Sequence, residues 1–468
     1  MNTTRLSLQQ LHVRDYRCFA SLQIDFHPQL TVLVATNGAG KTSVLDAVAV
    51  ALGPFVGAFD EGVGRHFEAS DIRQVQVRQT AVLEMEYAPD GVWLEARGTV
   101  PGAASDMDGP LVTWQRALAG PTKAKTTVKD AKVLTDYGKR LQAAVRTPGS
   151  DVTLPLLAYY GTGRLWQQKK LTEAKRPGSS RSIGYTDCLD PASSYKSFVA
   201  WFRYWNLNAK ESRIKALEQG LQPDASEFNA YIDAVTGAVN TCLAPSGWRD
   251  MGYSFSLDTM VAQHPQQGQL AVELLSDGIR NMIGMVADIA FRAVKLNPQL
   301  GSQAALQTPG VVLIDEVDMH LHPEWQQVVL QGLSQAFPQV QFIVTTHSPQ
   351  VLSTVRKECV RVLGWDTEGA MVATEPLANT YGVPSHKVMQ QVMHVDPQPP
   401  VHERDDLDTL TRLVDQGLYD TPQATQLMAD LMVQLGATHE HLQRLQRSID
   451  RQRFLHGAGR DAAGGSSA

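Results

Sequence analysis

Residues 35–42, with the sequence ATNGAGKT, combine two glycines, a lysine and a threonine at a spacing that could bind phosphate. The strand-like run Leu30 to Val34 precedes this loop. A helical stretch from Lys41 to Leu52 follows it, and Gly53 and Pro54 are expected to end that helix. A strand, a glycine-rich turn and a helix in this order form the context that a phosphate-binding loop requires.

Each polar group of the loop has a role in this interpretation. Gly38 and Gly40 allow backbone N–H groups to turn toward phosphate, Lys41 can bring a positive charge to the terminal phosphates, and Thr42 can offer its hydroxyl to magnesium. The helix N-terminus adds partial positive charge. The motif normally opens with glycine, whereas this chain has Ala35, whose methyl group restricts the backbone. The predicted nucleotide-binding residues of the loop are Asn37, Gly38, Ala39, Gly40, Lys41, Thr42 and Ser43.

Two adjacent carboxylates end the apolar run Val311 to Glu316, VVLIDE. Four consecutive apolar residues predict a buried parallel strand. Because side chains alternate along a strand, we expect Asp315 and Glu316 to point in different directions. One carboxylate could then hold magnesium while the other polarises an attacking water. Two solvated acids at the start of a loop are the alternative interpretation.

Two further polar groups occur at element ends. His347, in VTTHSP, follows the predicted strand Val340 to Thr345 and could hydrogen-bond a terminal phosphate, although a histidine at a strand end is usually structural. Ser276, in LSDGIRN, has the character of a helix N-cap, and Gly278 permits close approach of the backbone. This helix start could bind an anion without a lysine, or it could be an ordinary capped helix.

Other acids and histidines fit a structural role better. Asp406 and Asp408 form a DxD pair, but the apolar residues around them have helical spacing, which predicts a solvated helix face rather than a nuclease site. His320 and His322 lack nearby cysteines or further metal ligands, so we expect them to shape the loop after Glu316.

The elements that position these residues alternate between strands and helices, which predicts an α/β fold with a parallel sheet. Alternating stretches between about 55 and 100 indicate a flanking antiparallel sheet, and helical pieces follow around 130–146 and 195–217 without a sustained heptad repeat. We therefore divide the 468 residues into five regions. These are an N-terminal part of the core (1–100), a helical insertion without long coiled coils (101–270), a C-terminal part of the core (271–375), a helical region (376–455) and a disordered tail (456–468).

Composition excludes several classes of protein. Apolar residues are 43% and charged residues 19% of the chain, which is ordinary for a globular protein. No apolar run reaches the roughly 18 residues of a membrane span, and the start lacks the apolar stretch of a signal peptide. The four cysteines are far apart and form no CxxC pair. We expect a cytoplasmic protein with reduced thiols.

The net charge of −6 argues against a protein coated in nucleic acid, but two basic stretches could contact a phosphate backbone without reading sequence. Flexible solvated loops are the alternative interpretation. The basic residues are Lys123, Lys125, Lys129, Lys132, Lys139, Arg140 and Arg146 in the first stretch, and Arg164, Lys169, Lys170, Lys175, Arg176 and Arg181 in the second.

In the order ATNGAGKT, LSDGIRN, VVLIDE and TTHSP, the chain resembles the ABC ATPase superfamily. The resemblance implies a head-to-head dimer with two shared ATP sites. It further implies that Lys41 and Thr42 bind phosphate and Mg²⁺, and that Asp315 binds Mg²⁺. Glu316 would be the catalytic base, His347 a switch histidine, and Ser276 and Gly278 would act on the opposite site. The glutamine of the usual Q-loop is not clearly placed; Gln74 and Gln76 are both possible.

The segments DYRCFASLQIDF, LLAYYGTGRLW and IDEVDMHLHPEWQQ resemble compact SMC-like ATPases of prokaryotic anti-phage systems, namely the PtuA family of Septu systems and the retron-associated ATPases. This resemblance spans about residues 8–450. It implies a homodimer or higher oligomer that regulates a separate HNH nuclease of the PtuB type, in some systems with a retron reverse transcriptase and its DNA.

Three rival classes are a stand-alone SMC-like ATPase of DNA repair or maintenance, a transporter ATPase subunit, and a nuclease in its own right. A maintenance ATPase normally carries long coiled coils. A transporter subunit places its signature closer to the magnesium aspartate than Ser276 is to Asp315, and it lacks such a large middle insertion. A self-contained nuclease would cut DNA with metal and no partner.

Overall fold

The structure is a computed structural model that describes residues 5–79, 82–103, 111–122, 124–164, 180–191, 196–220 and 226–463. Two compact units make up the chain, Met1–Val395 and Asp396–Ala468, and each has its own hydrophobic core. The division lies at residue 395 because the packing around the large core continues through Val388 and Val392, past the predicted boundary at 376. In the described part of the chain, no helix is both long and apolar enough to cross a membrane.

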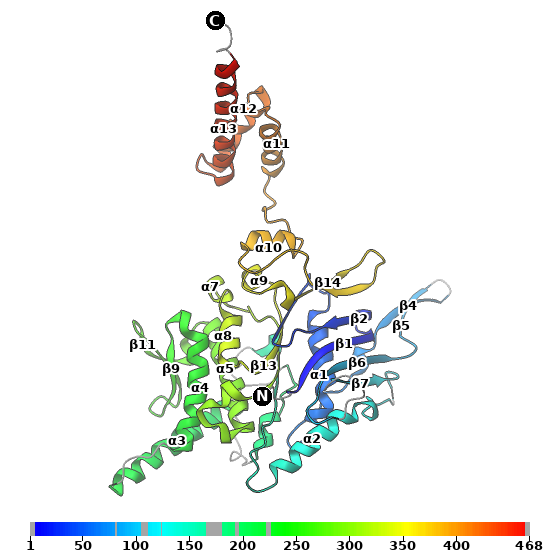
Figure 1. Ribbon diagram of the computed structural model, residues 1–468, viewed down its shortest axis with the longest axis vertical. Helices are drawn as coiled ribbons and strands as arrows, with labels where there is room; N and C mark the ends of the chain where they lie inside the picture. Colours follow the sequence, from blue (N-terminus) through cyan, green and yellow to red (C-terminus); the bar gives the residue numbers. More distant parts are fainter. Residues whose placement is uncertain are drawn as a thin grey trace. The chain divides into compact units, whose positions relative to one another are not determined.

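The central sheet of the first unit is six-stranded within the described residues, in the order β15-β14-β3-β13-β12-β8. Neighbouring strands from β14 to β8 run parallel, and β15 is antiparallel to β14. The parallel sheet expected from the sequence is therefore confirmed (Figure 1). Its strands are β3 (Leu30–Val34), β8 (Leu156–Tyr160), β12 (Gly310–Ile314), β13 (Val340–Thr345), β14 (Val360–Trp365) and β15 (Met371–Thr374).

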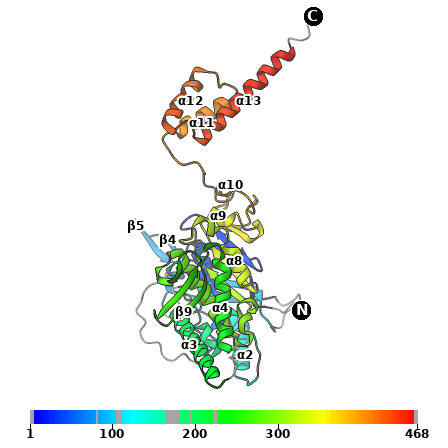
Figure 2. The ribbon, with the colours of Figure 1, turned by 90° about the vertical axis from the view of Figure 1, so that its left-hand side faces the viewer.

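The flanking antiparallel strands form a sheet of order β2-β1-β6-β7, which confirms the antiparallel sheet predicted beside the core, although β6 is its only strand within the predicted range 55–100. A β4·β5 hairpin and a sheet of order β11-β10-β9 complete the described strands, and β9 lies beside α4 (Figure 2). The bounds are β1 (Ser7–Tyr16), β2 (Phe19–Asp25), β4 (Gln74–Gln79), β5 (Val82–Tyr87), β6 (Val92–Thr99), β7 (Leu111–Leu118), β9 (Arg249–Ser254), β10 (Thr259–His264) and β11 (Gly268–Ala271).

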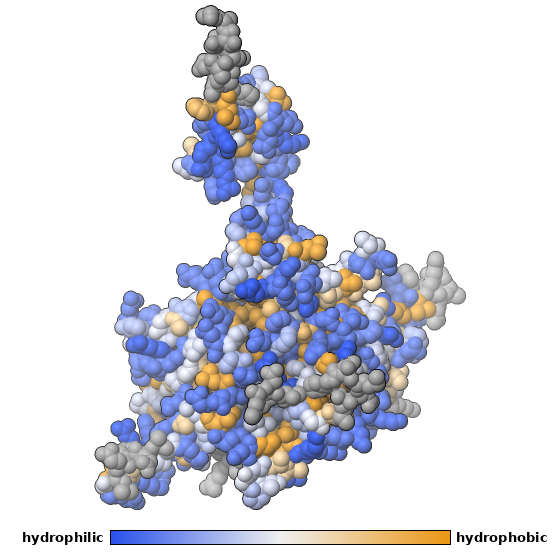
Figure 3. Space-filling model, viewed as in Figure 1, coloured by the Kyte–Doolittle hydropathy of each residue, from blue (hydrophilic) through white to orange (hydrophobic). Residues whose placement is uncertain are grey.

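The helices of the first unit include the two that cover the central sheet, α1 and α5. The bounds are α1 (Lys41–Val56), α2 (Lys132–Val145), α3 (Lys196–Glu218), α4 (Glu227–Leu243), α5 (Asp277–Leu296), α6 (Ala304–Gln307), α7 (Pro323–Gln326), α8 (Val329–Ala336), α9 (Pro349–Leu352) and α10 (Ser385–Gln391). The face of the molecule in Figure 3 carries scattered apolar residues among mainly hydrophilic ones.

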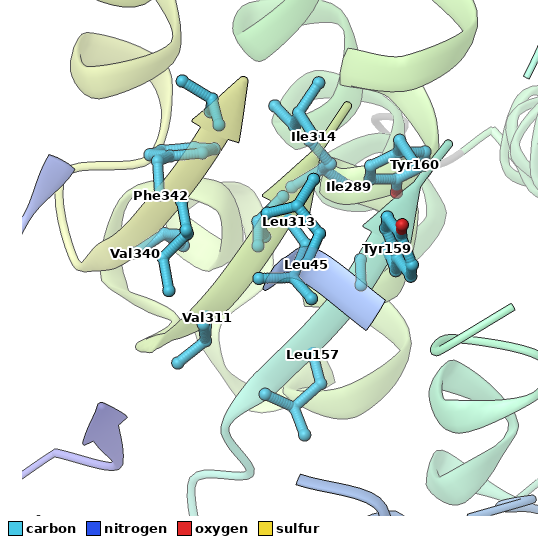
Figure 4. Packing of buried hydrophobic residues seen from close by; sticks show 14 of the residues in the cluster. Leu45, Leu157, Tyr159, Tyr160, Ile289, Val311, Leu313, Ile314, Val340 and Phe342 are labelled. Atoms are coloured by element: carbon cyan, nitrogen blue, oxygen red, sulfur yellow. The ribbon is translucent and has the colours of Figure 1, made fainter. Parts of the chain in front are cut away.

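Strand β8 shows how α1 and α5 are placed. Successive strand residues point to opposite faces of a sheet. Burial and the nearby carboxylate of Asp46 on α1 raise the pKa of Tyr159, whereas the hydroxyl of Tyr160 donates to Asp288 of α5 at 2.7 Å. The two helices therefore cover opposite faces of the central sheet. Figure 4 shows Leu45 of α1 and Ile289 of α5 packed with the apolar side chains of β8, β12 and β13.

Helix α1 also packs against the antiparallel sheet, so apolar residues surround it on all sides. It does not end at Leu52, as the sequence predicted, but continues to Val56 with Pro54 inside it. Proline has no N–H to donate to the carbonyl of Val50. The buried guanidinium of Arg116 on β7 donates to that carbonyl at 2.8 Å instead. This contact from another sheet lets the helix continue past the proline.

The assignment of residues 101–270 to a helical insertion needs correction. Strand β7 belongs to the antiparallel sheet, and β8 is an edge strand of the central sheet. The five residues of β8 are all buried, and β8 pairs with β12, whose residues come about 150 positions later in the chain. The pairing is non-local, so local periodicity in LLAYY could not reveal it. The helices expected around 130–146 and 195–217 are present as α2 and α3.

The second unit contains the helices α11 (Arg404–Asp415), α12 (Pro422–Leu435) and α13 (Glu440–Ala463). Leu410, Val414, Leu431 and Leu442 form the centre of its core. Asp406 and Asp408 are exposed on α11, which confirms the solvated helix face predicted for them. Helix α13 extends to Ala463, so residues 456–463 are helical, and the remainder of the predicted tail lies outside the described residues.

Candidate nucleotide-binding site

The phosphate-binding loop lies between β3 and α1, where the sequence places it. Thr36, Asn37 and Gly38 are exposed, and Ala39 and Gly40 are half-buried. The N–H of Ala39 donates to the carbonyl of Thr36 at 3.3 Å, which closes a turn, and Gly40 is the N-cap residue of α1. The loop therefore presents the N-terminus of a 16-residue helix at an open surface.

Gly38 and Gly40 have backbone φ angles of 81° and 90°, in the left-handed region that favours glycine. A Cβ atom at Gly40 would lie 2.3 Å from the ring of Phe19 and 2.7 Å from the Cys18 sulfur, so the position also lacks space for a side chain. Ala35 is not among the residues with positive φ. The departure from glycine at the first motif position therefore imposes no backbone strain in this loop.

Lys41 is only 7% exposed and its ammonium donates to the carbonyl oxygens of Ala35 at 3.1 Å and Thr36 at 3.3 Å. Burial lowers the pKa of Lys41 from its ordinary value, and the carboxylates of Asp315, Glu316 and Asp318 oppose that shift. A cation held inside the loop close to these acids can exchange the carbonyl contacts for phosphate oxygens.

Asp315 follows the end of β12 and is 3% exposed. Its Oδ2 accepts a hydrogen bond from the Thr42 hydroxyl at 2.8 Å, across 273 residues of sequence. Its Oδ1 accepts one from the Thr345 hydroxyl at 2.6 Å. Thr42 and Asp315, predicted to share a magnesium ion, therefore lie in direct contact.

Glu316 is half-buried, with a φ of 48°. Strand β12 ends at Ile314, so the two acids do not alternate along a strand, which corrects the prediction from the sequence. The backbone turns into the left-handed region at Glu316, which costs free energy for a non-glycine residue. The N–H of Glu316 donates to the Thr345 hydroxyl at 2.7 Å, and this bond stabilises the turn.

His347 follows β13 by two residues and is half-buried. Strand β13 lies between β3, which leads into the phosphate-binding loop, and β12, which leads to the acids. The carboxyl ends of these parallel strands meet at one edge of the sheet, which brings His347 to the same edge as Lys41 and Glu316. Parallel α/β sheets bind ligands at this edge.

Ser276 is the N-cap residue of α5, as predicted, but its side chain makes no capping hydrogen bond and is exposed. The neighbouring Leu274 is 73% exposed. Gly278 faces inward, and a Cβ atom there would lie 2.4 Å from the carbonyl oxygen of His320. The helix start thus touches the loop that follows Glu316 while it presents a hydroxyl and an apolar side chain outward.

The remaining candidates have other positions. His322 accepts a hydrogen bond from the N–H of Glu324 and caps α7, in agreement with a structural role in this loop. His320 has a φ of 62° and contributes its carbonyl oxygen to the contact with Gly278. Gln74 and Gln76 are exposed on β4, in the β4·β5 hairpin. Neither glutamine is assigned to the site.

Parts of both basic stretches make intramolecular contacts. Arg140 donates to the carbonyls of Pro101 and Gly102, Arg146 pairs with Asp60, and Arg181 donates to the carbonyls of Val152 and Leu296. These three guanidinium groups therefore already have partners. The predicted residues Lys123, Lys169, Lys170, Lys175 and Arg176 and the side chain of Arg164 lie outside the described residues.

Sequence reasoning missed two residues that hold the site together. Thr345 contacts both acids, and a hydroxyl as the last residue of a buried strand was the available signal. Arg17, in the β1–β2 turn, binds Asp46 of α1 at 2.5 Å and Asp71 at 2.8 Å. This ion-pair network fixes the turn that places Phe19 against Gly40.

The residues present fit a magnesium nucleotide. The loop supplies left-handed glycines, a helix N-terminus and a buried lysine, and the adjacent strand end supplies a hydroxyl and a carboxylate in contact. Hydroxyl and carboxylate oxygens are ligands that Mg²⁺ accepts. Thr42 and Asp315 would hold the ion, which would supply positive charge beside the phosphates.

Two family models match the chain, and together they cover the residues of this candidate site. A family model described as an AAA domain matches residues 10–229, which contain the phosphate-binding loop. A second model, described as an AAA domain of a putative AbiEii toxin of a type IV toxin–antitoxin system, matches residues 245–353, which contain Ser276, Asp315, Glu316 and His347.

The chain is similar along most of its length to two curated retron proteins. It is 24% identical to the Retron Vc95 probable ATPase of Vibrio cholerae serotype O1 biovar El Tor, over 90% of this chain and 86% of that protein. It is 24% identical to the Retron Ec83 probable ATPase of Escherichia coli, over 96% of this chain and 87% of that protein.

A shorter segment is 38% identical to the Septu protein PtuA of Bacillus mycoides (strain KBAB4), over 24% of this chain and 15% of that protein. The resemblance to retron-associated and PtuA-type ATPases is thus confirmed. Among solved structures, an SMC head bound to the C-terminal winged-helix domain of ScpA matches with a TM-score of 0.45 and 15% identity, over 78% of this chain and 97% of that one.

Proposed function

We propose that the protein binds ATP and Mg²⁺ between two copies of itself, hydrolyses the ATP, and thereby controls a partner nuclease in anti-phage defence. The observation that carries this proposal is the contact between Thr42 and Asp315, because it joins the phosphate-binding loop to the end of β12. Glu316 follows Asp315 directly and His347 lies at the same sheet edge, so binding and catalytic groups converge there.

The roles of the residues follow from their chemistry. Lys41 and the N–H groups of residues 37–43 would bind the phosphates, and preorganised charges of this kind stabilise the charge that develops in phosphoryl transfer. Glu316 would orient and deprotonate the attacking water, and His347 would hydrogen-bond the terminal phosphate. The left-handed backbone at Glu316 is the kind of local strain that occurs at functional sites.

Two features of the start of α5 support a shared site. The Ser276 hydroxyl is exposed and not used in capping, so it is available to a phosphate of a second copy. Leu274, also exposed, would be covered in the same contact. In such a dimer, Ser276 would complete the partner's ATP site, whereas Glu316 would belong to the ATP site of its own chain. The contact between Gly278 and His320 would then connect these two sites.

The proposal of a defence role rests on the retron and Septu relatives, and the partner is proposed to be an HNH nuclease of the PtuB type. A retron reverse transcriptase with its DNA is a further proposed component, and the site of action is proposed to be the cytoplasm. Binding of nucleic acid independent of sequence would involve the residues of the two basic stretches other than Arg140, Arg146 and Arg181, whose guanidinium groups make intramolecular contacts.

The test is a pull-down from the native host with tagged wild type, Lys41→Ala and Lys387→Ala. Lys387 is exposed on α10, so its variant controls for the loss of a lysine elsewhere. We expect a nuclease to co-purify with the wild type and the control, and ATPase activity to disappear only in Lys41→Ala. An active ATPase recovered on DNA without a nuclease would contradict nuclease control and favour a repair or maintenance ATPase.

A further inference from the structure

Thr345, the last residue of β13, makes three hydrogen bonds to three successive residues of the neighbouring segment. Its hydroxyl donates to Oδ1 of Asp315 at 2.6 Å and accepts from the N–H of Glu316 at 2.7 Å. Its carbonyl accepts from the N–H of Val317 at 3.0 Å. The residue is 0% exposed, so water does not compete for these bonds.

The two hydroxyl bonds constrain different properties of the acids. The bond to Oδ1 fixes the carboxylate of Asp315 so that its other oxygen meets the Thr42 hydroxyl. The bond from the Glu316 N–H stabilises a backbone conformation that a glutamate rarely adopts. A single hydroxyl can do both because it carries one donor and two acceptor sites.

We propose that Thr345 is a positioning residue that sets the geometry of the Mg²⁺ site through Asp315 and the direction of Glu316 through its backbone. The inference rests on the proposed function, because it assigns a role in the same site. Thr345 would not touch the nucleotide; it would act through the two acids.

The type of side chain supports this role. A β-branched residue in a strand has a restricted χ1 angle, so the Thr345 hydroxyl is held in one direction. Valine has nearly the same shape but cannot form either hydroxyl bond, and serine retains the hydroxyl without the methyl group. These two replacements separate the hydrogen bonds from the packing.

The next residue extends the connection toward His347. The hydroxyl of Thr346 donates to Asp318 at 2.5 Å and accepts from the N–H of Ser348 at 2.9 Å. Two consecutive threonines thus join the segment that carries His347 to the segment that carries the acids. A displacement of either segment would therefore be transmitted to the other.

The experiment measures the affinity of a fluorescent ATP analogue as a function of Mg²⁺ concentration and in EDTA. It compares the wild type with Thr345→Val, Thr345→Ser and, as a control, Thr308→Val. Thr308 is equally buried and accepts a hydrogen bond from Asn297 at 3.0 Å, away from the acids. Loss of a hydrogen bond to a carboxylate predicts that Thr345→Val needs about tenfold more Mg²⁺ for half-saturation.

Affinity in EDTA should stay the same in all four proteins, and Thr345→Ser should resemble the wild type. An unchanged Mg²⁺ requirement in Thr345→Val, or an equal loss of affinity in EDTA, would overturn the inference, since the second result indicates general damage. If Thr345→Val does not fold, Thr345→Ala and Thr345→Ser give the same comparison.

ATP hydrolysis by the wild type separates this inference from the proposed function. A wild type that binds but does not hydrolyse ATP contradicts the proposed function, and the Mg²⁺ titration still decides the role of Thr345. If the wild type hydrolyses ATP and Thr345→Val binds the nucleotide with the same Mg²⁺ dependence as the wild type, only the inference about Thr345 is contradicted.

Discussion

Replacement of Arg116 by methionine tests how the helix behind the phosphate-binding loop is stabilised. The Arg116 side chain is 0% exposed and donates to the carbonyls of Val50 at 2.8 Å and Thr127 at 2.7 Å. Bonds from a charged donor contribute about 1.5–3 kcal/mol each. Burial disfavours the charged guanidinium and lowers the pKa of Arg116 to about 10, so desolvation places these bonds at the lower end of that range. We expect Arg116→Met to lower the free energy of unfolding by about 2 kcal/mol.

Pro54→Ala should reduce that loss. An alanine at position 54 has an N–H that can donate to the Val50 carbonyl, which Arg116→Met leaves without its partner. The two substitutions should therefore couple by about 1 kcal/mol, so that the double variant is more stable than the sum of the single effects predicts.

Urea unfolding followed by tryptophan fluorescence measures this coupling, because all 8 tryptophans lie before residue 396 and report on the first unit alone. Arg97→Met, at an exposed position of β6, controls for the loss of an arginine. Effects of Pro54→Ala and Arg116→Met that add within about 0.4 kcal/mol would refute the reasoning, because the Val50 carbonyl would then not depend on Arg116.

Two further predictions concern the loop and the helix α5. Gly40→Ala should abolish ATP binding and lower stability, because its Cβ would lie 2.3 Å from the Phe19 ring. Gly38→Ala should only weaken binding, because its Cβ would meet no atom within 4 Å. Nucleotide titration of both variants checks this order of affinities. Burial lowers the pKa of Lys295 to about 8 from 10.5, so the charged form destabilises the fold below pH 8 and this cost disappears as the pH rises toward 10.5. Lys295→Met also removes the contact of the ammonium with the Trp201 ring, which offsets part of the gain. The variant should therefore raise the free energy of unfolding by about 1 kcal/mol at pH 7 and by less at pH 9.5. A gain that does not depend on pH would contradict a lowered pKa of Lys295.

The sequence predicts the elements around the site because their signals are local. Residues 35–42 contain the loop, and the apolar run before Asp315 identifies a buried strand without any knowledge of its neighbours. The N-cap at Ser276 is likewise readable from a polar residue before an apolar helix pattern. These features depend on the preferences of short segments.

The features that the sequence does not reveal depend on distant partners. Continuation of α1 past Pro54 depends on Arg116, which comes 62 positions later, and the place of β8 in the sheet depends on β12. Thr345 acquires its role only because β13 lies beside β12. No local pattern encodes such contacts, so they became visible only with the fold.

The central claim, an ATP site shared by two copies, is tested most directly by the mass of Glu316→Gln in solution with ATP and Mg²⁺. Loss of the base should halt hydrolysis and trap the ATP-bound dimer, so light scattering should give twice the mass of one chain. Glu316→Gln combined with Ser276→Arg should stay monomeric, because the exposed Ser276 would face the partner's nucleotide. A monomeric Glu316→Gln protein that binds ATP, or one that still hydrolyses it at the wild-type rate, would contradict the account.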